Sequence, residues 1–530
     1  MTVKTVYFEF KNLTLNYGEP EIEQKSVNLT VGSDETSRNL TWYANSETAG
    51  QVQYAKKSDM KDGQFPSEYQ TADAISAQSN ESGFYSNQAT MRNLDENTEY
   101  VYRVVNGETV SEEYTFQTGD FDGAFSFAFV GDPQIGAGSL PSDIQGWNDT
   151  LDVIKNQLNP DFLFSAGDQV NTANNESQYT GYLNDTFSSL TSATTIGNHD
   201  SSSAAYNEHF NLPNESAQYG ATTAGSDYWF VYNNTLFMDI NSNDRSAAEH
   251  KQFMQDAIAA NPDVRWKTVV FHHSIYSTAS HASDGDIIDR RNELPQIFDE
   301  LDIDVVLMGH DHVYTRTYMM DGFTPDRSQG VQSSVTNPTG ILYLTANSAS
   351  GSKYYGITAP EAEYAAVQDQ SKRRTVTNVE VTNTSYTMTT YFADDMSVLD
   401  TFTIYKTLNT ADMESLISQA QGLNQADYTE ESWNKLQAAL KAATELKNNA
   451  NATQSDIDAA TTALQEAIDG LVKVDNQDGE VVNTGDTSDE QINGPQTGDT
   501  ANAVEIVSAV SAFIAAGTIV VVLTKKKMKS

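Results

Sequence analysis

The chain has 530 residues, with 73 acidic against 31 basic side chains and a formal net charge of −42. This length predicts about three or four domains, and the negative charge argues against nucleic-acid binding because phosphate backbones would be repelled. The sequence contains no cysteine, which excludes disulfides, thiol catalysis and Cys-ligated zinc. Any metal ion must therefore be held by His, Asp, Asn or Gln side chains.

Residues 26–119 are predicted to form an antiparallel β-sandwich. Short runs such as VNLTV, NLTWYA and TEYVYRVV alternate apolar and polar residues and are separated by turn residues, which is the period expected of half-buried strands. Segment 94–102 resembles the tyrosine corner of fibronectin type III-like domains. We interpret this domain as an inert spacer rather than as a ligand-binding module.

Residues 120–408 show a different sequence pattern and are predicted to form an α/β domain. Apolar runs such as FSFAFVGD, DFLFSAGD and DVVLMGH end in polar residues, and helical patterns such as TLDVIKNQL alternate with them. Because α/β folds place their sites at the carboxyl ends of strands, this domain is the candidate for catalysis.

Five short segments of this domain place metal-ligating side chains at predicted strand ends. They are GDPQ at 131–134, GDQVN at 167–171, GNHD at 197–200, VVFHH at 269–273 and GHDH at 309–312. Each segment alone is weak, since a Gly-Asp pair is usually a turn and a lone His is usually a structural hydrogen-bonding residue. All five in order, each at a strand end, make chance a poor explanation.

The order of these segments is similar to that of the calcineurin-like metallophosphoesterases. Trp266, Tyr276 and the run GHDHVYTR from Gly309 narrow the resemblance to the purple acid phosphatases, in which a fibronectin type III-like domain commonly precedes the catalytic domain. The resemblance implies a β-sandwich flanked by helices, a dinuclear metal centre and hydrolysis of phosphate esters by a metal-bound hydroxide.

The resemblance also assigns ligands residue by residue. Asp168 would bridge two metal ions. The first metal ion would take Asp132, Asp168 and His312, to which we add Gln134 as a neutral ligand. The second metal ion would take Asp168, Asn198, His272 and His310.

Four further side chains are candidates for contact with the substrate. His199 would donate a hydrogen bond to the phosphoryl oxygens. His281, nine residues beyond His272, would be the general acid for the leaving group, or else an exposed loop histidine. Arg290 and Arg291 are candidates for a substrate clamp, with a helix-surface role as the default.

Two positions depart from the family pattern. Purple acid phosphatases have a Tyr three residues after the second Asp, whose phenolate colours ferric iron, and here that position is Asn171. The wider superfamily often has a His two residues after the first Asp, where this chain has Gln134. We therefore expect a protein that is not purple, in which two ions of Fe, Mn or Zn suit the site.

Phosphate monoesters are the expected substrates, because the nearest resemblance is to acid phosphatases and His281 could protonate an alkoxide leaving group. A phosphodiesterase or nucleotidase with the same metal ions is the alternative. A second alternative is a cell-wall adhesin that uses the domain only as a scaffold. Buried carboxylates and imidazoles argue against the adhesin, since they are costly without a metal ion to pair with.

Residues 409–474 are predicted to form a module of three helices. SWNKLQAALKAATEL and IDAATTALQEAIDGL carry apolar residues at helical spacing, and Thr453 with Asp456 gives a start resembling a capping box. The run YTEESW at 428–433 resembles the FIVAR modules of Gram-positive surface proteins. We interpret the module as a spacer rather than a carbohydrate-binding domain.

The C-terminal segments predict attachment to a cell wall. Residues 475–494 are acidic and rich in Gly, Asn and Thr, as in a disordered linker. Residues 495–530 resemble a sortase sorting signal, with Pro495, Thr497 and Gly498, an apolar transmembrane segment at 504–524 and a Lys-rich tail. The usual Leu before the Pro is Gly494, which leaves the sortase class open.

This resemblance implies an exported Gram-positive surface protein whose partners are sortase and peptidoglycan. Contact with the membrane would be limited to the C-terminal segment. The first residues, MTVKTVYFEF, do not show the pattern of a signal peptide. We therefore expect the start of the sequence to be truncated or misassigned.

Overall fold

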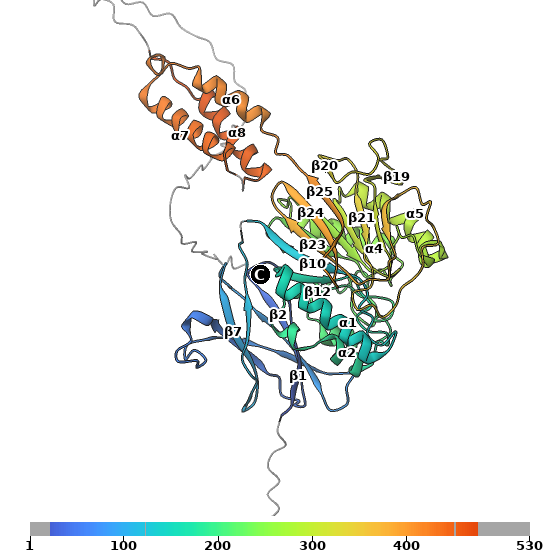
Figure 1. Ribbon diagram of the computed structural model, residues 1–530. Helices are drawn as coiled ribbons and strands as arrows, with labels where there is room; N and C mark the ends of the chain where they lie inside the picture. The colour runs from blue at the N-terminus through green and yellow to red at the C-terminus, as the bar shows by residue number, and fades with distance from the viewer. Residues whose placement is uncertain (1–21, 122, 450–451, 475–530) are drawn as a thin grey trace, which may run out of the picture. The chain divides into compact units, whose positions relative to one another are not determined.

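The computed structural model describes residues 22–121, 123–449 and 452–474 (Figure 1). The predicted linker at 475–494, the sorting signal with Pro495, Thr497 and Gly498, and the transmembrane segment at 504–524 lie outside these residues. Within the described ranges, no helix combines the length and apolar character needed to span a bilayer.

The N-terminal domain is a β-sandwich, as predicted. One of its sheets holds β1, β2, β6 and β5, and the other holds β4, β3, β7 and β8, with β9 paired to β7. The strands are β1 (Gln24–Val31), β2 (Arg38–Ala44), β3 (Gln51–Lys56), β4 (Gln70–Asp73), β5 (Ile75–Gln78), β6 (Tyr85–Met91), β7 (Glu99–Asn106), β8 (Thr109–Val110) and β9 (Tyr114–Gln117), with a short 3-10 helix η1 (Lys57–Asp59) after β3.

Alternating side chains from both sheets fill the core of this sandwich, among them Leu40, Trp42, Val52 and Phe116. The tyrosine corner is confirmed, because the hydroxyl of Tyr100 accepts a hydrogen bond from the backbone N–H of Asp95 at 2.8 Å.

The N-terminal domain is joined to the catalytic domain through a continuous sheet. Strand β1 pairs in parallel with β12 (Ser192–Thr194) of the catalytic domain, with Thr30 opposite Ser192. The eleven-stranded sheet therefore runs β20-β25-β24-β23-β10-β11-β12-β1-β2-β6-β5. The interpretation of this domain as an inert spacer rather than a ligand-binding module stays a prediction. The sequence did not predict the pairing of β1 with β12, because period-two alternation predicts a strand but not its partner.

The catalytic domain packs this sheet against a second, seven-stranded sheet in the order β13-β14-β15-β16-β21-β17-β22. Its strands are β10 (Phe125–Val130), β11 (Phe162–Ser165), β13 (Tyr228–Tyr232), β14 (Thr235–Asp239), β15 (Trp266–Phe271), β16 (Val305–Met308), β17 (Tyr314–Thr317), β18 (Met320–Asp321), β19 (Thr324–Pro325), β20 (Ser334–Thr336), β21 (Leu342–Thr345), β22 (Ala365–Asp369), β23 (Thr375–Val381), β24 (Ser385–Phe392) and β25 (Val398–Tyr405). Phe127 and Phe162 of the first sheet and Phe237 and Val270 of the second share one buried cluster.

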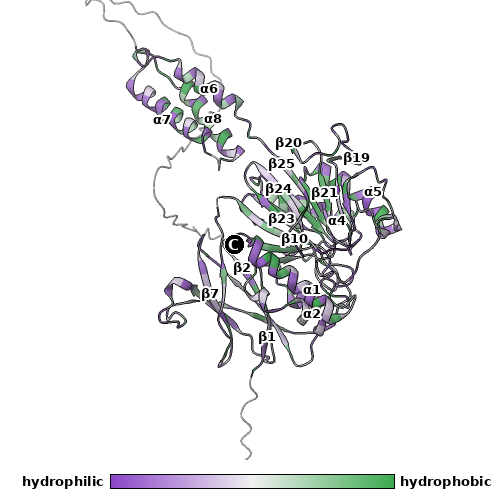
Figure 2. Cartoon of the chain, viewed as in Figure 1, coloured by the Kyte–Doolittle hydropathy of each residue, from purple (hydrophilic) through white to green (hydrophobic). Residues whose placement is uncertain are grey.

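Helices cover the outer faces of both sheets, so the predicted β-sandwich flanked by helices is confirmed. The first sheet carries α1 (Leu140–Val153), continued by a π-helical turn η2 (Ile154–Leu158), α2 (Glu176–Tyr182), η3 (Asp185–Ser188) and α3 (Ala205–His209). The second sheet carries α4 (Ala247–Ala260) and α5 (Gly285–Glu300), with η4 (Ser280–Ser283) before α5. Hydrophobic residues concentrate on the central strands, whereas the helices mix both kinds (Figure 2).

The predicted C-terminal helices are α6 (Ala411–Gln421), α7 (Glu430–Lys447) and α8 (Gln454–Asp469), with η5 (Gln425–Asp427) between the first two. Met413, Leu436 and Leu464 lie in a core cluster formed by the residues of this module. The capping box is confirmed, since the Thr453 side chain accepts from the Asp456 N–H and the Asp456 side chain accepts from the Thr453 N–H.

Candidate metal centre

The predicted ligands follow strands whose carboxyl ends meet at adjoining edges of the two sheets. β10, β11 and β12 run parallel in one sheet, and β15 and β16 run parallel in the other. Asp132, Asp168, His310 and His312 follow three of these strands with positive φ values of 33°, 50°, 72° and 44°. Non-glycine residues in this region cost free energy and concentrate at functional sites.

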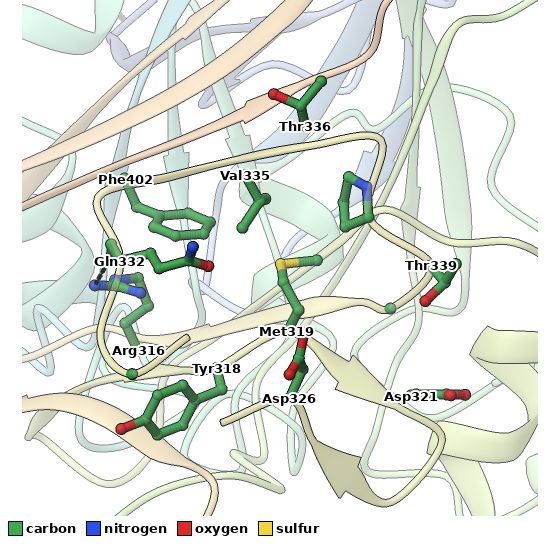
Figure 3. A pocket seen from close by; sticks show the side chains of 13 residues that line it. Arg316, Tyr318, Met319, Asp321, Asp326, Gln332, Val335, Thr336, Thr339 and Phe402 are labelled. Atoms are coloured by element: carbon green, nitrogen blue, oxygen red, sulfur yellow. Dashed lines mark hydrogen bonds between the residues drawn. The ribbon is translucent and has the colours of Figure 1, made fainter. Parts of the chain in front are cut away.

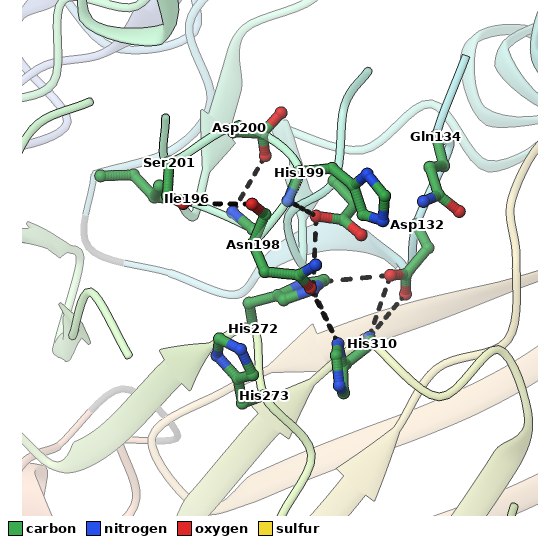
Figure 4. Close-up of polar contacts among 12 residues, drawn as sticks. Asp132, Gln134, Ile196, Asn198, His199, Asp200, Ser201, His272, His273 and His310 are labelled. Atoms are coloured by element: carbon green, nitrogen blue, oxygen red, sulfur yellow. Dashed lines mark hydrogen bonds and ion pairs between the residues drawn. The ribbon is translucent and has the colours of Figure 1, made fainter. Parts of the chain in front are cut away.

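Four side chains form what we name the second subsite, which consists of Asp168, Asn198, His272 and His310. Figure 4 shows Asn198, His272 and His310 side by side. Asn198 Oδ1 lies 3.0 Å from His272 Nε2 and 3.0 Å from His310 Nδ1. These two ring nitrogens are 3.2 Å apart, and His272 Nε2 lies 3.4 Å from Asp168 Oδ1. The arrangement gathers donors of the kind that hold divalent cations.

The tautomer of His272 is set by its second nitrogen. His272 Nδ1 lies 2.8 Å from the carbonyl oxygen of Ala166, which can only accept, so Nδ1 carries the proton. The lone pair of Nε2 therefore faces Asp168 and Asn198 when the ring is neutral, as in metal sites whose ligand histidines are held by backbone carbonyls.

We name Asp132, Gln134, Asp168 and His312 the first subsite. Asp132 Oδ1 lies 3.5 Å from His312 Nε2, and the ligand atoms of Asp132, Asp168 and His272 all lie within 4.8 Å of one another. His312 Nδ1 donates to the Lys353 carbonyl at 2.9 Å, which leaves Nε2 facing Asp132. Gln134 is 1% exposed, and within the described residues its Oε1 has no hydrogen-bond partner. A cation would supply that oxygen with a partner.

Electrostatics in the centre also fit cations. Burial raises the pKa of Asp132 well above its usual range. Burial would likewise raise the pKa of Asp168, but His272 and His199 outweigh this effect and lower it. Burial acts against the charged form of His272, yet Asp168 and Asp132 raise its pKa to about 9. Two buried carboxylates thus rely on one imidazole for counter-charge, which a metal ion could replace.

The other two ligand histidines are held in the neutral form. Burial, reinforced by His273 and His272, lowers the pKa of His310 well below its usual range. Burial lowers the pKa of His312 to about 4. Neutral imidazoles are the form that binds metal ions, so both rings are ready for that role at neutral pH.

His199 and His281 both lie beside the proposed ligands. The His199 backbone N–H donates to Asp168 Oδ1 at 2.8 Å, and His199 Nδ1 donates to the Asn171 carbonyl at 2.8 Å. The ring centroids of His281 and His310 are 4.4 Å apart, and His281 Nδ1 lies 2.6 Å from Asp284 Oδ2. The catalytic roles of both histidines stay predictions.

The expectation of a helix-surface role is wrong for Arg290 of α5, whereas Arg291 is half-buried. Arg290 is 6% exposed and donates to the Ser242 carbonyl and to Asp286. Arg291 donates to the Ala282 carbonyl at 2.8 Å and so supports the segment that carries His281. Both guanidinium groups hold backbone in place, and their contacts are with the protein rather than with the metal centre.

Lys353 and Tyr355 were missed by sequence reasoning and lie next to the centre. The Tyr355 ring is 4.9 Å from that of His281 and 5.3 Å from that of His312, and Lys353 Nζ lies 4.6 Å above the Tyr355 ring. Among the described residues, the partly buried Lys353 has no carboxylate within ion-pair distance. Both residues lie in an irregular loop after β21, where no motif marks them.

A separate cavity of about 250 Å³ lies in the same domain, which we name the Arg316 cavity (Figure 3). Its lining includes Arg316, Tyr318, Asp326, Gln332 and Phe402. Arg316 makes an ion pair with Asp400 and stacks on Phe402 at 4.4 Å. None of the predicted metal ligands lines this cavity.

Comparison with known proteins agrees with this geometry. Residues 125–314 match the family of calcineurin-like phosphoesterases. The central domain is therefore similar to this family over residues 125–314. Residues 24–118 match the purple acid phosphatase N-terminal domain, and residues 409–472 match the FIVAR domain.

Two solved structures share the fold of this chain. A purple acid phosphatase from yellow lupin (Lupinus luteus) seeds has a TM-score of 0.60 at 16% identity, over 72% of this chain and 74% of that chain. PhoD has a TM-score of 0.51 at 13% identity, over 72% of this chain and 89% of that chain.

Sequence relatives match over short segments. An α-L-arabinofuranosidase of Bifidobacterium longum subsp. longum is 37% identical over 102 residues, which is 19% of this chain and 9% of the relative. A lacto-N-biosidase of the same organism is 41% identical over 61 residues, which is 12% of this chain and 4% of the relative. The chain thus spans less than a tenth of either relative.

Proposed function

We propose that the protein hydrolyses phosphate monoesters at a dinuclear metal centre. The observation that carries the proposal is the convergence of Asn198 Oδ1, His272 Nε2 and His310 Nδ1 within 3.2 Å of one another, beside Asp168. Ring nitrogens and an amide oxygen gathered around a carboxylate form a complete donor set for a cation.

The second subsite would hold one metal ion and the first subsite the other, with Asp168 shared between them. Two metal ions in such a site lower the pKa of water and stabilise charge on the phosphoryl group. Gln134 would contribute its otherwise unpartnered oxygen to the first ion. Mn, Zn and Fe suit these nitrogen and oxygen donors alike, and Asn171 stands where a phenolate would favour ferric iron.

Three cationic or hydrogen-bonding side chains would act on the substrate. His199 would contact a phosphoryl oxygen as charge develops there. His281, held by Asp284 at 2.6 Å, would give its proton to the leaving oxygen. Lys353 would neutralise the second negative charge that distinguishes a monoester from a diester, which matters in a chain whose net charge of −42 repels anions.

We further propose that the enzyme works at the surface of a Gram-positive cell. The FIVAR match and the Bifidobacterium relatives support an extracellular location. Sortase would cut between Thr497 and Gly498 of the sorting signal and join the protein to peptidoglycan. Membrane contact would be confined to segment 504–524, and nucleic acid is not an expected partner.

The test is metal content and substrate preference on the same sample of the full chain. Elemental analysis should find two metal ions per chain, and p-nitrophenyl phosphate should be hydrolysed faster than bis-p-nitrophenyl phosphate. Faster turnover of the diester would instead favour a phosphodiesterase or nucleotidase. Absence of metal and of turnover after reconstitution with Mn, Zn or Fe would contradict the proposal and favour an adhesin.

A further inference from the structure

The N-terminal domain contacts both flanks of the loop that carries Asn198. This loop, residues 195–204, follows β12 and leads into α3. On the first flank, β1 pairs with β12 at Ser192, three residues before the loop begins. On the second flank, the carbonyl oxygen of His209, the last residue of α3, accepts from Thr41 Oγ1 at 2.7 Å. Carbonyls at a helix end have no partner inside the helix, so this contact completes α3.

One side chain of the N-terminal domain touches both flanks. Asn28 on β1 is fully buried, and its Nδ2 donates to the His209 carbonyl at 2.9 Å. Its Oδ1 accepts from Ser192 Oγ on β12 at 3.4 Å. Asn28 therefore fixes the spacing between the strand that precedes the metal-binding loop and the helix that follows it.

Aromatic stacking also connects His209 to α2, the helix that follows the loop of Asp168. The His209 ring stacks on Tyr43 of the N-terminal domain, with centroids 4.5 Å apart and planes at 15°, and its other contact is Tyr179 of α2 at 4.4 Å. His209 Nε2 also lies 2.9 Å from Glu176 Oε2 at the start of α2. Two of the three loops that supply ligands from this sheet, those after β11 and β12, thus lead into helices that meet at His209.

The two ends of the Asn198 loop are also linked directly. The carbonyl oxygen of Thr194, at the end of β12, accepts from Tyr206 of α3 at 2.9 Å and from Tyr228 of β13 at 2.8 Å. A shift of α3 would therefore be passed to the residue just before the loop. Ligands must be held to within about 0.5 Å for tight metal binding. A shift of α3 that displaced Asn198 would therefore lower metal affinity.

We propose that the N-terminal domain positions the second metal subsite by holding both flanks of loop 195–204, with Asn28 as the main positioning residue. The inference rests on the proposed metal-binding role of Asn198. It assigns the domain a part in metal affinity that a spacer would not have. Loss of partners that orient ligands typically costs about 10- to 100-fold in metal affinity, and an indirect contact falls at the lower end.

The experiment compares Asn28→Ala with Asn87→Ala in the full chain. Asn87 is equally buried, accepts from Gly50 N–H at 2.9 Å and donates to the Tyr85 carbonyl at 3.2 Å, so all of these contacts stay within the N-terminal domain. Metal-free protein is titrated with Mn²⁺ or Zn²⁺ by calorimetry, and the unfolding temperature is measured with and without the ion. This readout does not depend on catalysis.

Asn28→Ala should weaken one of the two metal sites about 10-fold and reduce the rise in unfolding temperature that metal produces. Asn87→Ala should lower the unfolding temperature equally with and without metal and leave the titration curve unchanged. A wild-type titration curve for Asn28→Ala would overturn the inference. Wild-type protein that binds no metal would overturn the proposed metal centre as well, so the two failures can be told apart.

A second pair of variants preserves side-chain shape in case Asn28→Ala does not fold. Thr41→Val removes only the hydroxyl that donates to His209, and Thr118→Val removes a hydroxyl that donates to the Asp95 carbonyl at 2.6 Å inside the N-terminal domain. Both threonines are 1% exposed. Weaker metal binding in Thr41→Val alone supports the inference, and equal behaviour of the two variants contradicts it.

Discussion

The metal centre and the Arg316 cavity are both polar regions of the catalytic domain, but their charges are arranged differently. In the Arg316 cavity, the guanidinium group is matched by Asp400, with Nη2 3.3 Å from Oδ1. In the metal centre, the recorded ion-pair partners of Asp132 and Asp168 in the described part of the chain are histidines. The guanidinium group of the first region is already paired with a carboxylate, whereas the two carboxylates of the second need a proton or a cation for balance.

This difference separates a cavity from a reactive site. The Arg316 cavity has a volume of about 250 Å³, yet the basic side chain in its lining is already paired with Asp400. The metal centre is defined instead by donor atoms at 3.0–3.5 Å from one another that need a common partner. If activity depends on the unpaired carboxylates, substitutions at the metal centre should lower turnover more than substitutions in the Arg316 cavity.

The largest effect is expected from Asp168→Ala. Removal of the shared carboxylate should empty both subsites and lower kcat/KM by about 1,000-fold or more, since two metal ions supply several kcal/mol of transition-state stabilisation. Elemental analysis and turnover of p-nitrophenyl phosphate measure the two losses. Asp289→Ala, at a side chain that is 63% exposed, is the control and should keep both. Retention of metal by Asp168→Ala would disprove the bridging role.

His281→Ala should lower turnover in a way that depends on the leaving group. Alkyl phosphates release a basic alkoxide, so loss of a general acid should cost about 100-fold. p-Nitrophenolate leaves without a proton, so its release should change little. The ratio of kcat for the two substrates is the readout. An equal loss on both would show that His281 only packs against His310 and Tyr355.

Asp200, a buried carboxyl in the loop that carries Asn198, should make the stability of the metal-free protein depend on pH. Burial and then Asp168 raise its pKa to about 7. Between about pH 4 and pH 7 the native state keeps a proton that the unfolded state has released, so the free energy of unfolding falls as pH rises through this range. The expected fall is on the order of a few kcal/mol.

Asp200→Asn should flatten this dependence, because an amide does not titrate and can still accept from the Gly197 N–H. Urea unfolding of chelator-treated protein at about pH 4.5 and pH 7.5 measures the difference between the two chains. Parallel pH dependence in wild type and variant would contradict the assignment to Asp200.

The sequence predicted the catalytic fold and the proposed ligands because both depend on local pattern. Apolar strands such as β10 and β16 end in Gly-Asp or Gly-His, and parallel strands bring their carboxyl ends to one edge. This pattern marked the strand ends as a candidate site, and the resemblance to a known family assigned Asp132, Asp168 and His312 to one metal centre.

Contacts between distant segments could not be predicted in this way. The pairing of Thr30 with Ser192 joins residues more than a hundred positions apart, and alternation of apolar residues does not identify a partner strand. Lys353 reaches the centre from an irregular loop without a motif. Arg290 lies on a helix whose composition suggests an exposed position, but its guanidinium group is buried on the Ser242 carbonyl.

The smallest effects come from a matched pair of substitutions, one in each region. Lys353→Gln at the metal centre should lower kcat/KM about 10-fold for the monoester and change the diester less, because a charge-assisted hydrogen bond to the extra phosphoryl charge is lost. Tyr318→Ala in the Arg316 cavity should leave both substrates within about twofold, as is usual for changes away from the reacting groups. Steady-state kinetics with both p-nitrophenyl substrates give the two ratios. If Tyr318→Ala lowered turnover more than Lys353→Gln, the cavity rather than the unbalanced charge would mark where substrate binds.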